Sequence, residues 1–128
     1  MTVYVETDFL LALAKDSDWL QGSAEDALDE SEVETSAFSY LELVLARERY
    51  EFDYVPLVAN LLELVPVRDE KEKQVVLKAV NSYDEGMTPF DAFHAATAET
   101  RGLDVLSSEK DYGDIEVSRV PMEPTDGE

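Results

Sequence analysis

The chain has 128 residues, which is enough for one domain with its own hydrophobic core, and its lack of cysteine excludes disulfides, thiolate nucleophiles and cysteine-based zinc sites. Its 30 acidic residues outnumber 10 lysines and arginines, which gives a formal net charge of -20. The sequence has no membrane-length apolar segment and no signal-peptide pattern at its start, so we expect a cytoplasmic protein.

Hydrophobic periodicity predicts alternating strands and helices. In chain order they are a strand at 2–6, helices at 9–14 and 19–28, a strand at 33–36, helices at 37–50 and 54–64, a strand at 65–67, helices at 69–83 and 89–102, a strand at 103–106, a helix at 108–112 and a strand at 116–120. Such alternation favours parallel strands joined by right-handed crossovers. We therefore expect a three-layer α/β/α domain over residues 1–120 with a central parallel sheet of four to five short strands, followed by a flexible acidic tail at 121–128.

The helix at residues 37–50 carries an apolar stripe. Phe38, Leu41 and Leu45 recur at helical spacing and predict the face that packs on the core. Glu42 lies on the same stripe, where a carboxylate facing the core needs a partner.

The acidic excess is spread along the chain rather than gathered in a tail, as residues 26–34 and 69–72 show. Taken alone, this charge argues against a nucleic-acid partner, because such proteins normally use a basic surface. Concentrated salt would screen that repulsion. We therefore interpret the composition as halophilic, of the haloarchaeal type, and only weakly as a statement about the substrate.

Acidic residues also stand where the predicted strands turn into helices. They are Glu6 with Asp8, Glu42, Asp91, and Glu109 with Asp111. In a parallel α/β sheet the functional crevice lies at the carboxyl ends of the strands, so these residues can reach one edge. Carboxylates gathered there repel one another unless a hard divalent cation neutralises them, which predicts an all-oxygen site for Mg²⁺ or Mn²⁺.

Each acid also has an ordinary structural explanation. Asp91 can complete a capping box with Thr88, and Glu6 and Glu109 taken singly fit surface positions. His94 lies one turn after Asp91, where a packing role is more common than a ligand role. A phosphorelay receiver has a similar size and acidic pocket, but Asp91 follows a helix start rather than a strand.

Four segments match a known pattern in order and spacing. They read Val5-Glu6-Thr7-Asp8-Phe9-Leu10, Ser39-Tyr40-Leu41-Glu42-Leu43, Thr88-Pro89-Phe90-Asp91-Ala92-Phe93-His94-Ala95-Ala96 and Val105-Leu106-Ser107-Ser108-Glu109-Lys110-Asp111-Tyr112. Over most of its length the chain resembles the PIN domain family, and especially its VapC-type toxin nucleases. Two positions depart from the family pattern, because Glu6 and Glu109 stand where the family usually has Asp. Each keeps the carboxylate but lengthens the side chain by one methylene, which affects how well it can meet the strict geometry of Mg²⁺.

The resemblance implies a metal-dependent endoribonuclease, either the toxin of a VapBC-type toxin–antitoxin pair or an RNA-processing nuclease. It implies an RNA substrate, a homodimer and, for a toxin, a cognate antitoxin protein. The expected metal ligands are Glu6, Asp8, Asp91, Glu109 and Asp111. Glu42 is expected to bind metal or orient a water, Thr7 and Ser107 to hold the carboxylates by hydrogen bonds, and Arg47 and Arg49 to contact phosphates. The alternative is a catalytically weak PIN-like module that binds RNA or protein.

The halophilic interpretation predicts that folding depends on salt. We expect circular dichroism to show a folded chain in molar salt and a loss of structure on dilution, because carboxylate repulsion is screened only at high ionic strength. A chain that is fully folded in dilute buffer would contradict this.

Overall fold

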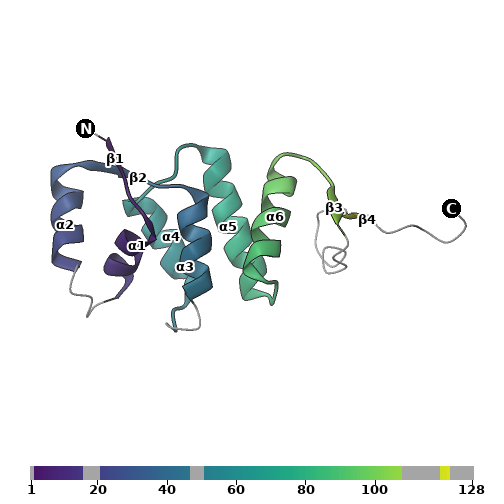
Figure 1. Ribbon diagram of the computed structural model, residues 1–128, viewed down its shortest axis with the longest axis horizontal. Helices are drawn as coiled ribbons and strands as arrows, with labels where there is room; N and C mark the ends of the chain where they lie inside the picture. The colour runs from purple at the N-terminus through teal and green to yellow at the C-terminus, as the bar shows by residue number, and fades with distance from the viewer. Residues whose placement is uncertain (1, 16–20, 47–50, 108–118, 122–128) are drawn as a thin grey trace, which may run out of the picture.

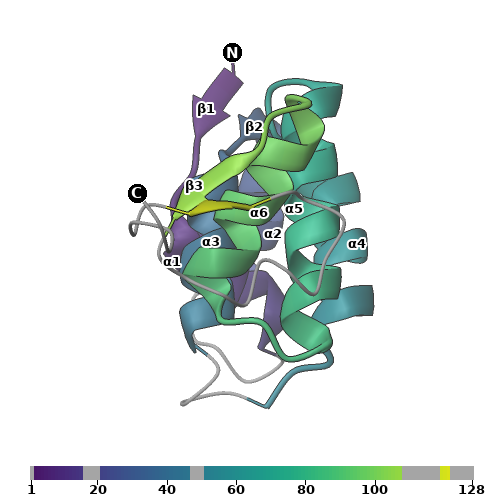
Figure 2. The ribbon, with the colours of Figure 1, turned by 90° about the vertical axis from the view of Figure 1, so that its right-hand side faces the viewer.

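The computed structural model describes residues 2–15, 21–46, 51–107 and 119–121. The elements are β1 (Thr2–Tyr4), α1 (Thr7–Ala14), α2 (Gln21–Glu30), β2 (Glu32–Glu34), α3 (Ala37–Leu45), α4 (Tyr54–Leu64), α5 (Glu70–Asp84), α6 (Pro89–Thr100), β3 (Val105–Ser107) and β4 (Arg119–Pro121). The helices stand side by side along the molecule, from α2 at one end to α6 near the other (Figures 1 and 2). The chain is a mostly helical α/β protein. No helix of the described ranges has the length and apolar character that crossing a bilayer requires.

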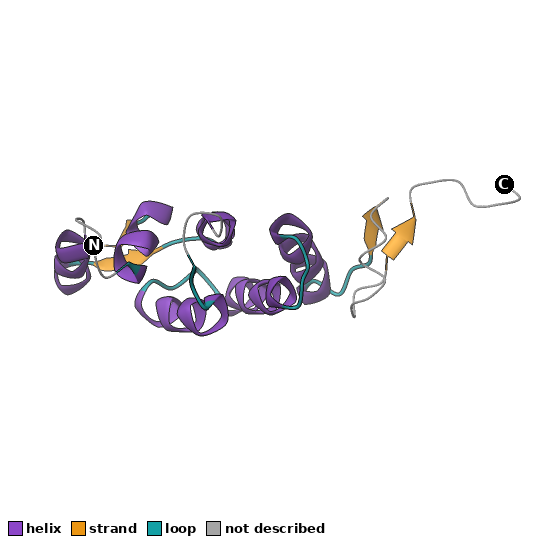
Figure 3. Ribbon diagram, turned by 90° about the horizontal axis from the view of Figure 1, so that it is seen from below, coloured by secondary structure: helices purple, strands orange, loops and turns teal. Residues whose placement is uncertain are grey.

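The described strands form two parallel pairs. β1 pairs with β2 in the register Val3↔Val33, and an isolated bridge joins Thr35 to Val67 on the other side of β2. β3 pairs with β4 in the register Leu106↔Val120 and lies beyond α6, at the opposite end of the molecule (Figures 1 and 3). Parallel pairing is therefore confirmed, but the structure has two separate pairs where we predicted a continuous sheet of four to five strands.

The element bounds follow the prediction closely in the middle of the chain. α4 has the predicted bounds, and α5 is displaced by one residue at each end. α6 begins at Pro89 as predicted, after Gly86 with a φ of 115° has reversed the chain. α1 begins two residues earlier than predicted, because Glu6 already takes the extended N-cap conformation. The predicted helix at 108–112 lies outside the described residues.

Our prediction that Phe38, Leu41 and Leu45 form the core face of α3 is wrong for Phe38 and Leu45, while Leu41 is half-buried and packs against the core. Phe38 is 64% exposed and Leu45 is 42% exposed, whereas Tyr40, Leu43 and Val44 are fully buried. Both stripes of this helix are apolar, so periodicity alone does not choose between them. Burying the first would carry Glu42 out of water, and an unpaired buried carboxylate is strongly unfavourable. The helix therefore packs with Tyr40, Leu43 and Val44 inward.

Two buried hydroxyl groups link the strands to the helices around them. The Tyr40 hydroxyl donates to the Val65 carbonyl at 2.8 Å, which joins α3 to the residue after α4. The Thr35 hydroxyl donates to the Val5 carbonyl at 2.7 Å, which holds the segment between β1 and α1 against the end of β2. Both side chains are buried, so each bond also satisfies a carbonyl that water does not reach.

Replacing Tyr40 with Phe should therefore lower the free energy of unfolding by about 1–2 kcal/mol, because the buried Val65 carbonyl loses its donor. Tyr4→Phe is the matched control. Its hydroxyl is 2.8 Å from the Ser36 hydroxyl at an exposed site, so the loss should stay below about 0.5 kcal/mol. Urea denaturation at constant high salt measures both, and equal losses would contradict the assigned role of Tyr40.

Burial also raises the pKa of Tyr40 above its ordinary value of 10.0. In the unfolded chain this phenol ionises near pH 10, but in the folded protein it stays protonated to higher pH, so folding becomes less favourable as pH rises above that value. We expect Tyr40→Phe to flatten the decline of the unfolding free energy above pH 10. A decline as steep as in the wild type would show that other groups cause it.

Candidate acidic site

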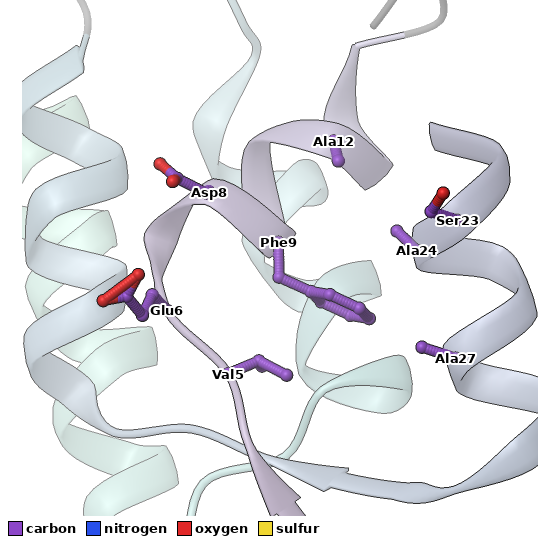
Figure 4. Close-up of a pocket in the computed structure, with 8 residues that line it drawn as sticks. All are labelled: Val5, Glu6, Asp8, Phe9, Ala12, Ser23, Ala24 and Ala27. Carbon is purple, nitrogen blue, oxygen red and sulfur yellow. The ribbon is translucent and has the colours of Figure 1, made fainter. Parts of the chain in front are cut away.

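Glu6 and Asp8 lie where β1 passes into α1. Glu6 is the N-cap residue of α1 but its carboxylate makes no capping hydrogen bond, and Asp8 belongs to the first turn. Both side chains are exposed. Figure 4 shows the two carboxylates on one side of the chain, opposite the ring of Phe9. These oxygens can therefore receive a ligand from solvent.

Thr7 connects this segment to α3. Its hydroxyl donates to Glu42 Oε1 at 2.8 Å and lies 3.4 Å from the Ser39 carbonyl oxygen. Glu42 is exposed, so our expectation that it faces the core is wrong, although the expected partner exists and is Thr7. The bond spans 35 positions in sequence and brings the acid of α3 beside the start of α1. It also orients one carboxylate oxygen of Glu42.

Asp91 lies in the first turn of α6 and is half-buried. The N-terminus of a helix favours a negative charge, because the free backbone N–H groups give it a partial positive charge. The Thr88 side chain makes no capping hydrogen bond, so the Thr88 half of the alternative capping box is absent. α3 packs against both α1 and α6, which places Glu42 on the helix between those that carry Glu6 and Asp91.

The donor set is all carboxylate and hydroxyl oxygen, which fits a hard divalent cation in chemical type. Within the four described ranges, however, no group of three or more His, Asp or Glu residues is placed to hold a metal ion. The remaining predicted ligands, Glu109 and Asp111, lie outside those ranges. So do Arg47 and Arg49, while for Ser107 the structure describes only its place at the end of β3.

Thr35 was missed by the sequence analysis. Its hydroxyl fixes the Val5 carbonyl, one residue before Glu6, and so positions the backbone from which that carboxylate extends. A threonine near a strand end is common, and no pattern in the sequence marks this one as buried. The sequence analysis also missed the apolar space between α1 and α2, because it is created by small residues on two separate helices.

A protein-family model described as the PIN domain matches residues 3–117, which takes in the strand end, the α3 acid, the α6 acid and the segment after β3. No curated protein matches the sequence at a significant level.

Proposed function

The chain belongs to the PIN domain family, and on that basis we propose that it is a metal-dependent endoribonuclease. The family is nuclease-like, and this agrees with a site built from exposed acids. The observation that carries most weight is the hydrogen bond from Thr7 to Glu42, because it joins two of the four acidic segments through side chains.

We assign roles to the acids from their places in the fold. Glu6, Asp8 and Asp91, together with Glu109 and Asp111, would hold one or two Mg²⁺ or Mn²⁺ ions. Such an ion supplies positive charge beside the phosphate and lowers the pKa of the attacking water. Glu42 would bind the ion or accept a hydrogen bond from that water. Thr7 keeps Glu42 in one orientation, and Ser107 would do the same for an acid near the end of β3.

We further propose that β3 joins the free edge of β1 in the active protein. Parallel sheets are normally many-stranded and covered on both faces, and an isolated pair of short strands is marginal in water. Among the residues that the structure describes, β1 pairs only with β2, and Thr2, Val3 and Tyr4 are exposed. Pairing with β3 would give the continuous sheet that we expected, and Glu109 and Asp111 would then follow β3 at the edge where Glu6 follows β1.

Two biological roles are consistent with this chemistry. A VapBC-type toxin would pair with an antitoxin protein and act as a homodimer, whereas an RNA-processing nuclease needs no such partner. Arg47 and Arg49 are proposed to contact substrate phosphates in either case. A small upstream reading frame for a DNA-binding protein would favour the toxin, and its absence would favour RNA processing.

The enzyme should cleave a mixed RNA pool in high salt when Mn²⁺ or Mg²⁺ is added, with the cut positions found by end mapping. Asp91→Asn should reduce the rate at least about 100-fold, because it removes a ligand charge at constant shape. The control is Asp84→Asn, the same chemical change at an exposed position of α5, which should leave the rate unchanged. Activity that survives Asp91→Asn would contradict the assignment. Binding without cleavage under either metal would favour the PIN-like binding module, for which the glutamates at positions 6 and 109 are the main argument.

The Thr7–Glu42 bond gives a prediction that does not depend on activity. Thr7→Val keeps the size of the side chain but removes the donor, and should weaken Mn²⁺ binding about tenfold in isothermal titration calorimetry. Thr7→Ser keeps the hydroxyl and should bind as the wild type does. Equal Mn²⁺ affinity in all three proteins would show that Thr7 has no role in the metal site.

A further inference from the structure

A pocket of about 330 Å³ opens between α1 and α2, beside the acidic site (Figure 4). Its volume is at the lower end of the range of about 300–1,000 Å³ that is typical of small-molecule sites. Glu6 and Asp8 lie at its border. Its other lining residues are Val5, Phe9, Ala12, Ser23, Ala24 and Ala27.

The pocket exists because the helix faces around it carry small residues. Ala12 belongs to α1, and Ala24 and Ala27 belong to α2, so neither helix fills the space between them. The half-buried ring of Phe9 points toward Ala24 and Ala27, away from the carboxylates of Glu6 and Asp8 (Figure 4). One side of the segment 5–9 is therefore apolar and aromatic, while the other is anionic.

The charge of the chain limits how RNA can bind beside these acids. Most RNA-binding proteins obtain affinity from contacts of Lys and Arg side chains with phosphates. This chain has only 10 lysines and arginines and 30 acidic residues. A divalent ion can neutralise the acids at one phosphate, but it does not supply affinity along the strand. Beyond the phosphate contacts proposed for Arg47 and Arg49, affinity can come from contact with the bases, because an aromatic ring that stacks on a base contributes independently of charge.

We propose that this pocket binds one unstacked base of single-stranded RNA, with the base against the ring of Phe9 and the strand continuing past Glu6 and Asp8 at the pocket border. The inference rests on the proposed function for its substrate, but its chemistry needs no metal. Glu6 and Asp8 border the pocket, so a strand with a base in the pocket passes beside the acidic site. The pocket would then hold a base close to the cut, and bases that stack more strongly on Phe9 would be modestly preferred there.

Neutral nucleosides test the pocket directly, because the acids do not repel them. Adenosine and cytidine are titrated into protein labelled with ¹³C at alanine methyl groups, in high salt without divalent ions. We expect the methyl signals of Ala12, Ala24 and Ala27 to shift. Phe9→Leu keeps an apolar side chain but removes the stacking ring, and should weaken the binding about tenfold. The control is Phe38→Leu, which removes an exposed ring of α3 and should leave the binding unchanged.

Two results would contradict the proposal that the pocket binds a base. The first is the absence of shifts at these methyl groups with every nucleoside. The second is an equal response to cyclohexanol, which would mark an apolar socket for a partner's side chain instead of a site for a base.

Cleavage by the full chain separates this inference from the proposed function. With RNA and Mn²⁺, Phe9→Leu should raise KM about tenfold and remove the base preference next to the cut, with a smaller change in kcat. If Phe9→Leu cleaves RNA with Mn²⁺ and keeps the base preference of the wild type, the proposal of a base-binding pocket is contradicted, whereas the proposal of nuclease activity is supported. If the wild type binds nucleosides but cleaves no RNA, the base-binding pocket is supported and the proposed nuclease activity is contradicted.

Salt dependence gives a second readout on the wild type. If bases supply most of the affinity, log KM should change little with log salt over the range in which the protein stays folded. On a single strand each phosphate contact adds about 0.7 to the slope of log KM against log salt. We expect a slope no greater than about 1.4, which corresponds to two such contacts. A steeper slope would show that phosphate contacts carry the binding.

Discussion

Glu42 cannot be buried without a partner, and this constraint determines how α3 packs. The helix has two apolar stripes, and the stripe without the carboxylate is the buried one. Glu42 is thereby exposed beside the start of α1, where the Thr7 hydroxyl reaches it. The same rotation carries Tyr40 inward to the Val65 carbonyl. A single desolvation penalty thus orients a core helix and presents an acid at the candidate site.

The remaining features of the site follow from neighbouring contacts. The Thr35 hydroxyl holds the peptide before Glu6, so this carboxylate extends from a fixed backbone although its side chain is exposed. The N-terminus of α6 provides a favourable potential for Asp91. Acids held on three separate elements of a chain with a net charge of -20 repel one another, so a cation that joins them would relieve much of that repulsion. A nuclease with so little positive charge also needs a non-ionic way to hold RNA, which is the role proposed for the pocket at Phe9.

The sequence predicted local features well where residue chemistry decides them alone. Thr88 and Pro89 start α6, and Glu6 follows the first strand. The motifs also indicated the family. The rotation of α3 was predicted wrongly, because we expected Glu42 to face the core with a partner, whereas its carboxylate stays exposed and the other apolar face is buried. The buried bond of Thr35 and the space between α1 and α2 likewise depend on contacts between distant segments. Strand pairing is also of this long-range kind, and two separate pairs of described strands stand where the alternation of strands and helices predicted a continuous sheet.

The central claim is that acids from separate elements hold one divalent cation. The most direct test is a crystal structure of the protein grown in high salt with Mn²⁺, using anomalous scattering to locate the ions. We expect Mn²⁺ to be coordinated by Glu6 and Asp91, with Glu42 binding it directly or through a water, and with an acid after β3 completing the shell. Manganese located only at scattered surface carboxylates, with Glu6 and Asp91 well apart, would contradict it.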